Sequence, residues 1–304
     1  ANTTATTDPT GGTNAVLDAA TANGGAHSIY KNFTSGSNGD NHTFSVWVKA
    51  AGVDYARIYV DTVGGNLGGP GVTFSTGNTW NVAASGVGTQ VATSAVEYPN
   101  GWWRLSVTGS YSNRNDFYFH IDLEGGEGDI SFTGNGSNGI YIWGAQAEAG
   151  GFPTSYIPTY GSTATRGADF AVLQKEDFTD AISQTEGTLI AEYDNVTSDG
   201  YVLSIDGSGG NKIGMVNSNG YQLMGQAGGS SQGTTDNGTL LSGTNRFALA
   251  YKVNDTAISI NGNTATVDTS YTLPTTTFMS IGHRQYQYDH LGSCIARVMY
   301  YNTR

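Results

Sequence analysis

Charge is the scarcest property of this chain. Charged residues make up 12% of its 304 residues, about half the usual share of roughly 25%. Most of that charge is negative: the formal net charge is −12, and both halves of the chain are acidic. Nucleic-acid sites need a basic patch, and anionic membranes attract basic segments. We therefore expect no nucleic-acid partner, whereas an uncharged ligand would meet no repulsion.

Cysteine and long apolar runs are also scarce. Cys294 is the only cysteine, so an intrachain disulfide is excluded. It lies in a strand-like pattern, which predicts a small buried hydrophobe more than a reactive thiol. No apolar run approaches the roughly 20 residues that span a bilayer, so we expect no membrane insertion. The opening ANTTATTDPT has no leader pattern. We expect that the protein is not secreted by that route or, the alternative that we favour, that the chain is a piece of a longer protein.

Helical periodicity is nearly absent, and no pattern predicts a helix longer than two turns. Glycine is abundant instead, with 44 residues, about twice its usual share of roughly 7%. Apolar and polar residues alternate in short runs separated by turn residues, which is typical of a sandwich or barrel. The expected strands of the first half cover residues 43–50, 55–61, 72–75, 78–85, 89–96, 101–110, 116–123, 129–132 and 140–148.

A second series of strands follows. Asn261-Gly262 between two alternating runs predicts a tight hairpin. Two glycine-rich segments, 64–71 and 228–237, are expected to be turns or loops. The expected strands of this half cover residues 188–193, 201–206, 212–217, 222–226, 245–253, 257–260, 264–267, 277–282 and 293–301.

The stretch 139–170 links the two series. It begins as a strand and continues through FPTSYIPTY, whose two prolines exclude a central strand. We expect this connector to lie against the first domain, because Phe152, Tyr156 and Ile157 would be costly to leave in water. The predicted domains are residues 1–151, a pinned connector 152–169 and residues 170–304, with the two domains held in a fixed pose.

Both halves resemble known families. TFSVWVKA, GWWRLSVT and IYIWGAQAEAGGFPTSYIPT resemble a module of tailed-phage virion proteins, which implies a jelly-roll sandwich similar to carbohydrate-binding modules. EGTLIAEYD, FALAYKVNDTAISING, FMSIGHR and IARVMYYNTR are similar to concanavalin A-like (laminin-G-like) domains. The resemblance implies an all-β protein of two tandem sandwiches with almost no helix.

Aromatic residues in polar segments are the candidate ligand contacts, because aromatic rings stack on the apolar faces of sugars. Trp103 and Phe44 are predicted to be core. Trp80, Trp102 and Trp143 suit either packing between domains or a ligand platform. The richest loop is 282–291, where a solvated loop is the simpler interpretation and a glycan or subunit contact is the alternative. Its candidate residues are His283, Arg284, Tyr286, Tyr288, Asp289 and His290.

An acidic, glycine-rich loop is the candidate metal site. Calcium takes six to eight oxygen ligands, which a flexible acidic loop can supply, although the EF-hand spacing is absent. The candidate ligands of a structural Ca²⁺ are Asp122, Glu124, Glu127 and Asp129. Asp8 and Glu148 form a second carboxylate pair to consider. No other cofactor is expected.

Catalytic motifs are missing. Glu192 and Asp194 share one strand face, but Val196 and Thr197 stand where a sandwich glucanase would carry its second glutamate. The five histidines show no metal-ligand spacing, and no Gly-x-Ser-x-Gly elbow occurs.

We therefore expect a non-enzymatic component of a tailed-phage virion. It would adhere to host-surface polysaccharide, contact other virion proteins, or do both, as a homo-oligomer with a trimer favoured. The alternatives are a polysaccharide lyase or glycoside hydrolase, and a purely structural adaptor without a glycan site.

Overall fold

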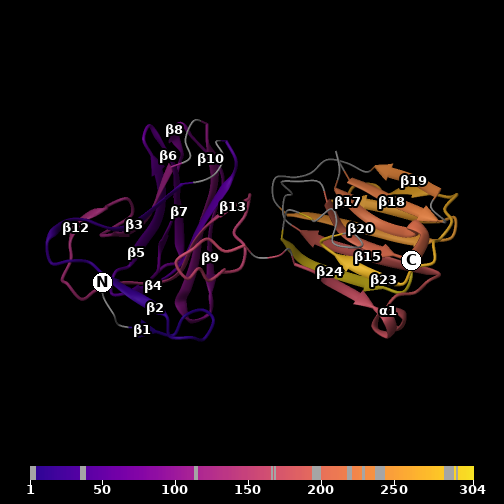
Figure 1. The fold of residues 1–304 in the computed structure, drawn as a ribbon, viewed down its shortest axis with the longest axis horizontal. Helices are drawn as coiled ribbons and strands as arrows, with labels where there is room; N and C mark the ends of the chain where they lie inside the picture. The colour runs from indigo at the N-terminus through magenta and orange to yellow at the C-terminus, as the bar shows by residue number, and fades with distance from the viewer. Residues whose placement is uncertain are drawn as a thin grey trace. The chain divides into compact units, whose positions relative to one another are not determined.

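The computed structural model describes residues 5–34, 39–112, 116–165, 167, 169–193, 200–217, 221–227, 230–236, 244–283, 291 and 294–304. The chain divides into two compact units, residues 1–165 and 166–304, and the division falls within the expected connector. Each unit is a sandwich of two antiparallel sheets (Figure 1). No helix within the described ranges is long and apolar enough to cross a bilayer.

The first sandwich pairs a six-stranded sheet with a seven-stranded sheet. The six-stranded sheet has the order β1 (Ala5–Thr6), β2 (Ala15–Ala19), β13 (Gly139–Ala149), β4 (His42–Ala51), β10 (Trp102–Tyr111) and β9 (Gly88–Tyr98). The seven-stranded sheet has the order β12 (Ser131–Thr133), β3 (Gly24–Thr34), β11 (Asp116–Glu124), β5 (Tyr55–Thr62), β6 (Gly65–Thr73) and β7 (Asn78–Val82), with β8 (Ser85–Gly86) paired to β6.

This strand order is that of a jelly roll. The centre of one sheet reads β2-β13-β4-β10, and the centre of the other reads β3-β11-β5-β6. Successive strands from β2 to β5 therefore alternate between the sheets, and β5 pairs with β6 as a hairpin, as in the interlocked Greek keys of a jelly roll. The fold class expected from the sequence is confirmed.

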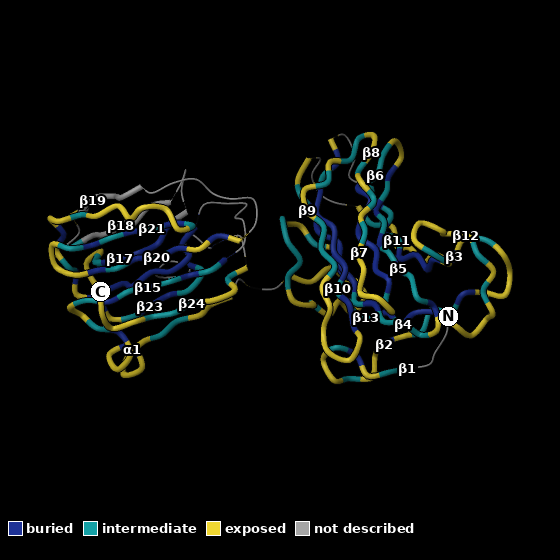
Figure 2. Tube along the Cα trace, turned by 180° about the vertical axis from the view of Figure 1, so that it is seen from behind, coloured by how far each residue is buried: buried dark blue, intermediate teal, exposed yellow. Residues whose placement is uncertain are grey.

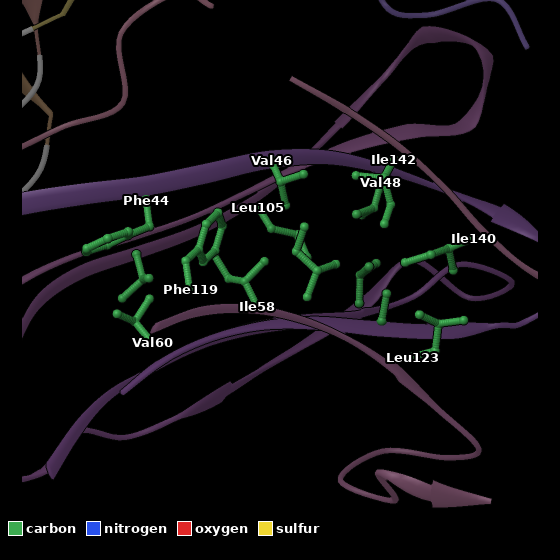
Figure 3. Close-up of a cluster of buried hydrophobic side chains, with 14 of the residues drawn as sticks. Phe44, Val46, Val48, Ile58, Val60, Leu105, Phe119, Leu123, Ile140 and Ile142 are labelled. Carbon is green, nitrogen blue, oxygen red and sulfur yellow. The ribbon is translucent and has the colours of Figure 1, made fainter. Parts of the chain in front are cut away.

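Alternating side chains of the two sheets form the core of the first sandwich. Phe44, Val46 and Val48 of β4 project from one sheet, and Ile58 and Val60 of β5 project from the other (Figure 3). All five are fully buried. The residues between them point to the opposite face of each sheet, which is partly exposed at Tyr59 of β5 but buried at Ser45 of β4. Figure 2 shows burial concentrated in the central strands and exposure in the turns.

The second sandwich has a six-stranded and a five-stranded sheet. The first has the order β14 (Ala171–Gln174), β23 (Phe278–Ile281), β16 (Gly200–Asp206), β17 (Lys212–Asn217), β18 (Tyr221–Ala227) and β19 (Ser230–Asp236). The second has the order β22 (Thr266–Asp268), β21 (Thr256–Ile260), β20 (Asn245–Lys252), β15 (Glu186–Tyr193) and β24 (Ile295–Tyr301).

One short helix, α1 (Lys175–Ala181), inserts Phe178 into the core of the second sandwich. The hairpin expected at Asn261-Gly262 is confirmed, because β21 pairs with β22. The Asn263 amide closes the turn on the Ile260 carbonyl at 2.9 Å.

The glycine-rich segment 64–71, expected to be a turn, is instead most of a strand. β6 lies between β5 and β7 in the sheet. Gly71 lies beneath the indole of Trp80, and a Cβ at this position would overlap the ring. The glycines therefore allow Trp80 to cover the sheet directly, a close approach that glycine permits within a strand.

Three further expectations are corrected. The polar segment 24–34, for which we expected no strand, forms the long strand β3. The segment 228–237, expected to be a loop, contains β19, which pairs with β18. Cys294, expected to be buried, is exposed and precedes β24. Low-complexity polar strands lack the apolar alternation on which strand prediction depends.

The first part of the connector contacts the first sandwich. We call residues 150–160 the strap. The Thr154 amide and hydroxyl donate to the Glu148 carboxylate at 2.9 and 2.7 Å, and the Ile157 amide donates to Gln146 at 2.7 Å. The Tyr156 ring packs 4.7 Å from that of Trp143. Strand β13 therefore holds the strap through both polar and aromatic contacts.

Glu148→Ala is expected to release the strap, because Thr154 loses both hydrogen bonds to the carboxylate. Local opening then becomes easier by about 1–2 kcal/mol, so a protease should cleave residues 150–160 of the native protein roughly tenfold faster. Timed limited proteolysis with mass spectrometry measures the rate. Glu97→Ala, which removes an exposed carboxylate from the same sheet, is the control. Equal cleavage rates in the two variants would contradict this account.

Candidate functional site

Of the three tryptophans predicted to serve either packing between domains or a ligand platform, Trp102 and Trp143 have different surroundings. Trp102 is only 2% exposed, and its indole N–H donates to the Thr7 carbonyl at 3.3 Å. It offers no ring face to a ligand, so the platform predicted there is wrong. Trp143 is half-buried, between the rings of Trp47 at 6.3 Å and Tyr156 at 4.7 Å. The rings of Trp47 and Tyr156 cover much of the surface of the Trp143 side chain.

The structure describes only a few residues of the loop 282–291. His283 is fully buried, and its ring stacks on Phe170 with centroids 4.7 Å apart, so it is not a surface contact. The predicted contacts Arg284, Tyr286, Tyr288, Asp289 and His290 lie outside the described residues.

The acidic loop is organised around Arg57. The Arg57 Nε lies 3.0 Å from an oxygen of Asp122 and 3.0 Å from an oxygen of Glu124. The Gly128 amide donates to the other Glu124 oxygen at 2.9 Å. The Asp129 carboxylate accepts a hydrogen bond from the Ser131 amide at 3.3 Å.

The Arg57 guanidinium therefore occupies part of the position at which a calcium ion was expected. No cluster of three or more His, Cys, Asp or Glu side chains suited to a metal occurs among the residues that the structure describes. The second carboxylate pair does not supply one, since Asp8 accepts from Thr10, Gly12 and Asn14 and Glu148 holds the strap.

A different surface brings aromatic and polar side chains together: the solvent face of the seven-stranded sheet. On β11, Phe117 and Phe119 point into the core, so the alternate residues Tyr118 and His120 face outward. Strand pairing places His120 beside Tyr59 of β5 and Tyr30 of β3. We define the outer aromatic face as Tyr30, Tyr59, Tyr118 and His120, with the polar residues Ser28, Arg57, Asp61 and Asp122.

The rings of this face contact one another and leave Tyr30 open to solvent. Tyr30 stacks on His120 with centroids 5.1 Å apart and lies 6.1 Å from Tyr118. The Tyr59 ring meets His120 edge-on at 5.8 Å. Tyr30 is 64% exposed. The outer aromatic face is therefore an aromatic platform in which Tyr118 and His120 pack beside the exposed ring of Tyr30.

Polar groups surround the rings. The two ring nitrogens of His120 lie 3.3 Å from the Ser28 hydroxyl and 3.3 Å from the Asp61 carboxylate. The Arg57 guanidinium lies over the Tyr59 ring at 5.4 Å. Burial, with Asp61 nearby, raises the pKa of the Tyr59 phenol, so this phenol stays protonated at neutral pH and can donate a hydrogen bond.

Part of this face could have been found in the sequence. Residues 116–123 were predicted to be a strand, and their alternation already separates Tyr118, His120 and Asp122 from the core residues. Tyr30 could not be included, because the segment 24–34 gave no strand signal.

No protein-family model and no curated protein matches this chain. Among solved structures, domains LG4-5 of the mouse laminin α1 chain are similar with a TM-score of 0.36 and 11% identity, over 99% of this chain and 93% of that chain. The LG1-3 region of the laminin α2 chain is similar with a TM-score of 0.34 and 12% identity, over 90% of this chain and 64% of that chain. Likeness at this level carries no argument about ligands.

Proposed function

We propose that this protein is a non-enzymatic adhesion protein that binds a glycan on the outer aromatic face. The single observation that carries the proposal is the open ring of Tyr30 beside Tyr118 and His120. Stacking a sugar on these rings removes apolar surface from water on both partners. Serine, histidine and carboxylate groups lie within the same face to hydrogen-bond sugar hydroxyls.

The charges of this face favour an uncharged glycan. Asp61 and Asp122 contribute two carboxylates, against the one guanidinium of Arg57. A uronate or phosphate group on the ligand would meet like charges at short range, which is unfavourable. Neutral hexoses carry no such penalty.

The setting that we propose is the virion of a tailed phage. The support is the sequence resemblance over residues 43–50, 101–108 and 140–159. In that setting the ligand is host-surface polysaccharide and the neighbours are other virion proteins. Several linked copies raise the avidity of weak sugar contacts by about 10²–10⁴-fold, which favours a homo-oligomer.

One observation bears on the enzymatic alternative. Ser28, His120 and Asp61 form a hydrogen-bonded chain in the order of a hydrolase triad. The strands that carry them use their amides in the sheet ladders, which leaves few donors for an oxyanion hole. Asp122, which pairs directly with Ser28, would repel a developing oxyanion. The geometry therefore favours binding over hydrolysis.

Glycan binding is tested on an array that carries neutral and acidic polysaccharides. We expect the intact chain to bind neutral glycans, and Tyr30→Ala to weaken that binding about tenfold, because it removes one aromatic contact. Tyr160→Ala is the control, since Tyr160 is 95% exposed and lies on the strap.

Equal loss in the two variants would contradict this assignment. Binding to no glycan, combined with stable assembly onto virion proteins, would favour the structural adaptor. Release of reducing ends, unsaturated uronate or free acid from a polysaccharide or ester would overturn the non-enzymatic proposal.

A further inference from the structure

Trp80 of β7 lies on the same side of the seven-stranded sheet as the outer aromatic face. Strand pairing places Arg57 of β5 opposite Gly71 of β6, and Gly71 opposite Trp80. Residues paired across neighbouring strands point to the same side of a sheet, and Arg57 belongs to the outer aromatic face. The indole lies over Gly71, in the space where a side chain would otherwise stand. Trp80 therefore covers the outer side of the sheet and not the core.

Tyr55 joins Trp80 in a second group of aromatic side chains. Tyr55 lies two residues before Arg57 on β5, so the two side chains point to the same side of the sheet. The rings of Tyr55 and Trp80 have their centroids 6.2 Å apart, and both residues are partly exposed. The exposed Asn78 lies two residues before Trp80 on β7, so its amide also points outward. We call Tyr55, Trp80 and Asn78 the second aromatic group.

Several strands separate the open ring of Tyr30 from the indole of Trp80. The sheet order β3-β11-β5-β6-β7 places four steps between the strands that carry these two residues. At about 4.8 Å for each step, the two strands lie roughly 19 Å apart. A single hexose ring is much smaller than this distance, so it can stack on one aromatic group or on the other. Only an extended chain of several sugars can contact both.

Polar side chains lie between the two aromatic groups. Strand pairing aligns Ser28, Asp122 and Arg57 in one row across β3, β11 and β5. The same row continues through Gly71 to Trp80. The Arg57 Nε donates to the Asp122 carboxylate at 3.0 Å. Hydroxyl, carboxylate and guanidinium groups are suitable partners for sugar hydroxyls, so the sugars in the middle of a bound chain would meet hydrogen-bonding groups.

We propose that the glycan-binding surface extends across the sheet from the outer aromatic face to the second aromatic group, and that it recognises a run of several neutral sugars and not a single terminal sugar. This inference rests on the proposed function, because Tyr30 contacts one end of the run. It adds a minimum length of the ligand, which Tyr30 alone does not set. A linear polysaccharide supplies such runs along its whole length.

Isothermal titration calorimetry of the whole chain with oligosaccharides of two lengths tests the extension. The probes are the disaccharide and the hexasaccharide prepared from a linear neutral polysaccharide that binds on the array. We expect the wild-type chain to bind the hexasaccharide at least tenfold more tightly, because only the longer probe reaches both aromatic groups. Trp80→Ala should weaken hexasaccharide binding about tenfold, the loss expected for one aromatic contact.

Trp143→Ala is the matched control, because it removes a half-buried tryptophan from the other sheet of the same sandwich. It should leave hexasaccharide binding unchanged. Disaccharide binding by Trp80→Ala shows that this variant is folded, since Tyr30 is still present. Tyr55→Ala should also weaken hexasaccharide binding, and it leaves the indole over Gly71 in place, so it serves as the second variant if Trp80→Ala does not fold.

The outcomes separate the extension from the proposed function. Equal affinities of the wild-type chain for the two probes, both weakened by Tyr30→Ala, would overturn the extension and leave the adhesion site in place. A preference for the hexasaccharide that persists in both Trp80→Ala and Tyr55→Ala would also overturn the extension, as would a hexasaccharide that does not bind. Binding to no neutral glycan on the array would overturn the proposed function itself, and the extension with it.

Discussion

Arg57→Leu is expected to lower the free energy of unfolding of the first sandwich by about 3–5 kcal/mol at neutral pH. Arg57 is the cation within 3.0 Å of both Asp122 and Glu124, and the Glu124 side chain is fully buried. Without the guanidinium, two neighbouring carboxylates remain out of water with no opposite charge. Urea denaturation followed by tryptophan fluorescence measures the loss.

The loss should depend on pH. Burial raises the pKa of Glu124, although the Gly128 amide and Arg57 act to lower it. The pKa of Glu124 in the folded state lies above the ordinary value of 4.5. The free energy of unfolding therefore falls as the pH rises from 4.5 through the folded-state pKa. Removing Arg57 raises the pKa of Glu124 further. The difference between wild type and variant should therefore be larger at pH 7.5 than at pH 5.

Lys31→Leu is the matched control for this prediction. Lys31 is an exposed cation on β3 of the same sheet, so its loss should change stability by less than about 0.5 kcal/mol. A similar small effect for Arg57→Leu, or a loss that grows as the pH is lowered, would show that the carboxylates do not depend on Arg57.

Gly139→Ala should disrupt the closing strand of the jelly roll. Gly139 pairs with Ala19 of β2, and its carbonyl accepts from the Val53 amide at 3.1 Å. A Cβ there would overlap the Asp18 carbonyl. Because backbone atoms move less easily than side chains, we expect a loss of about 3 kcal/mol, measured by thermal unfolding.

Gly126→Ala separates this contact from the general cost of replacing glycine. A Cβ at Gly126 meets no atom within 4 Å, so this variant should unfold close to wild type. If Gly139→Ala lowered the stability as little as Gly126→Ala does, that result would contradict the close approach of β13 to β2.

The strands that alternate clearly were predictable. Residues 43–50, 101–110 and 116–123 each place apolar side chains at every second position, and each forms a central strand in which those side chains are buried. Alternation succeeds here because alternate residues of a strand point to one face, and that face packs in the core. The contact of Tyr156 with Trp143 has a related reason, because an aromatic ring of the connector needs an apolar surface to cover.

Other elements depend on contacts that the local sequence does not show. β6 is a strand because Trp80, nine residues beyond Gly71, covers it. β3 is a strand because β11 pairs with it over eight residues. The outer aromatic face combines side chains from β3, β5 and β11, so its assembly requires the pairing of strands that are far apart in the chain. No spacing within one strand reveals that combination.

The most direct test of the central claim is to locate the bound glycan by hydroxyl-radical footprinting. The protein is saturated with a neutral oligosaccharide that binds on the array, and tyrosine oxidation is compared with the free protein. The account predicts protection of Tyr30 and Tyr118 and unchanged oxidation of Tyr98 and Tyr301, which lie on other sheets. Protection of Tyr98 or Tyr301 with Tyr30 unchanged would contradict it.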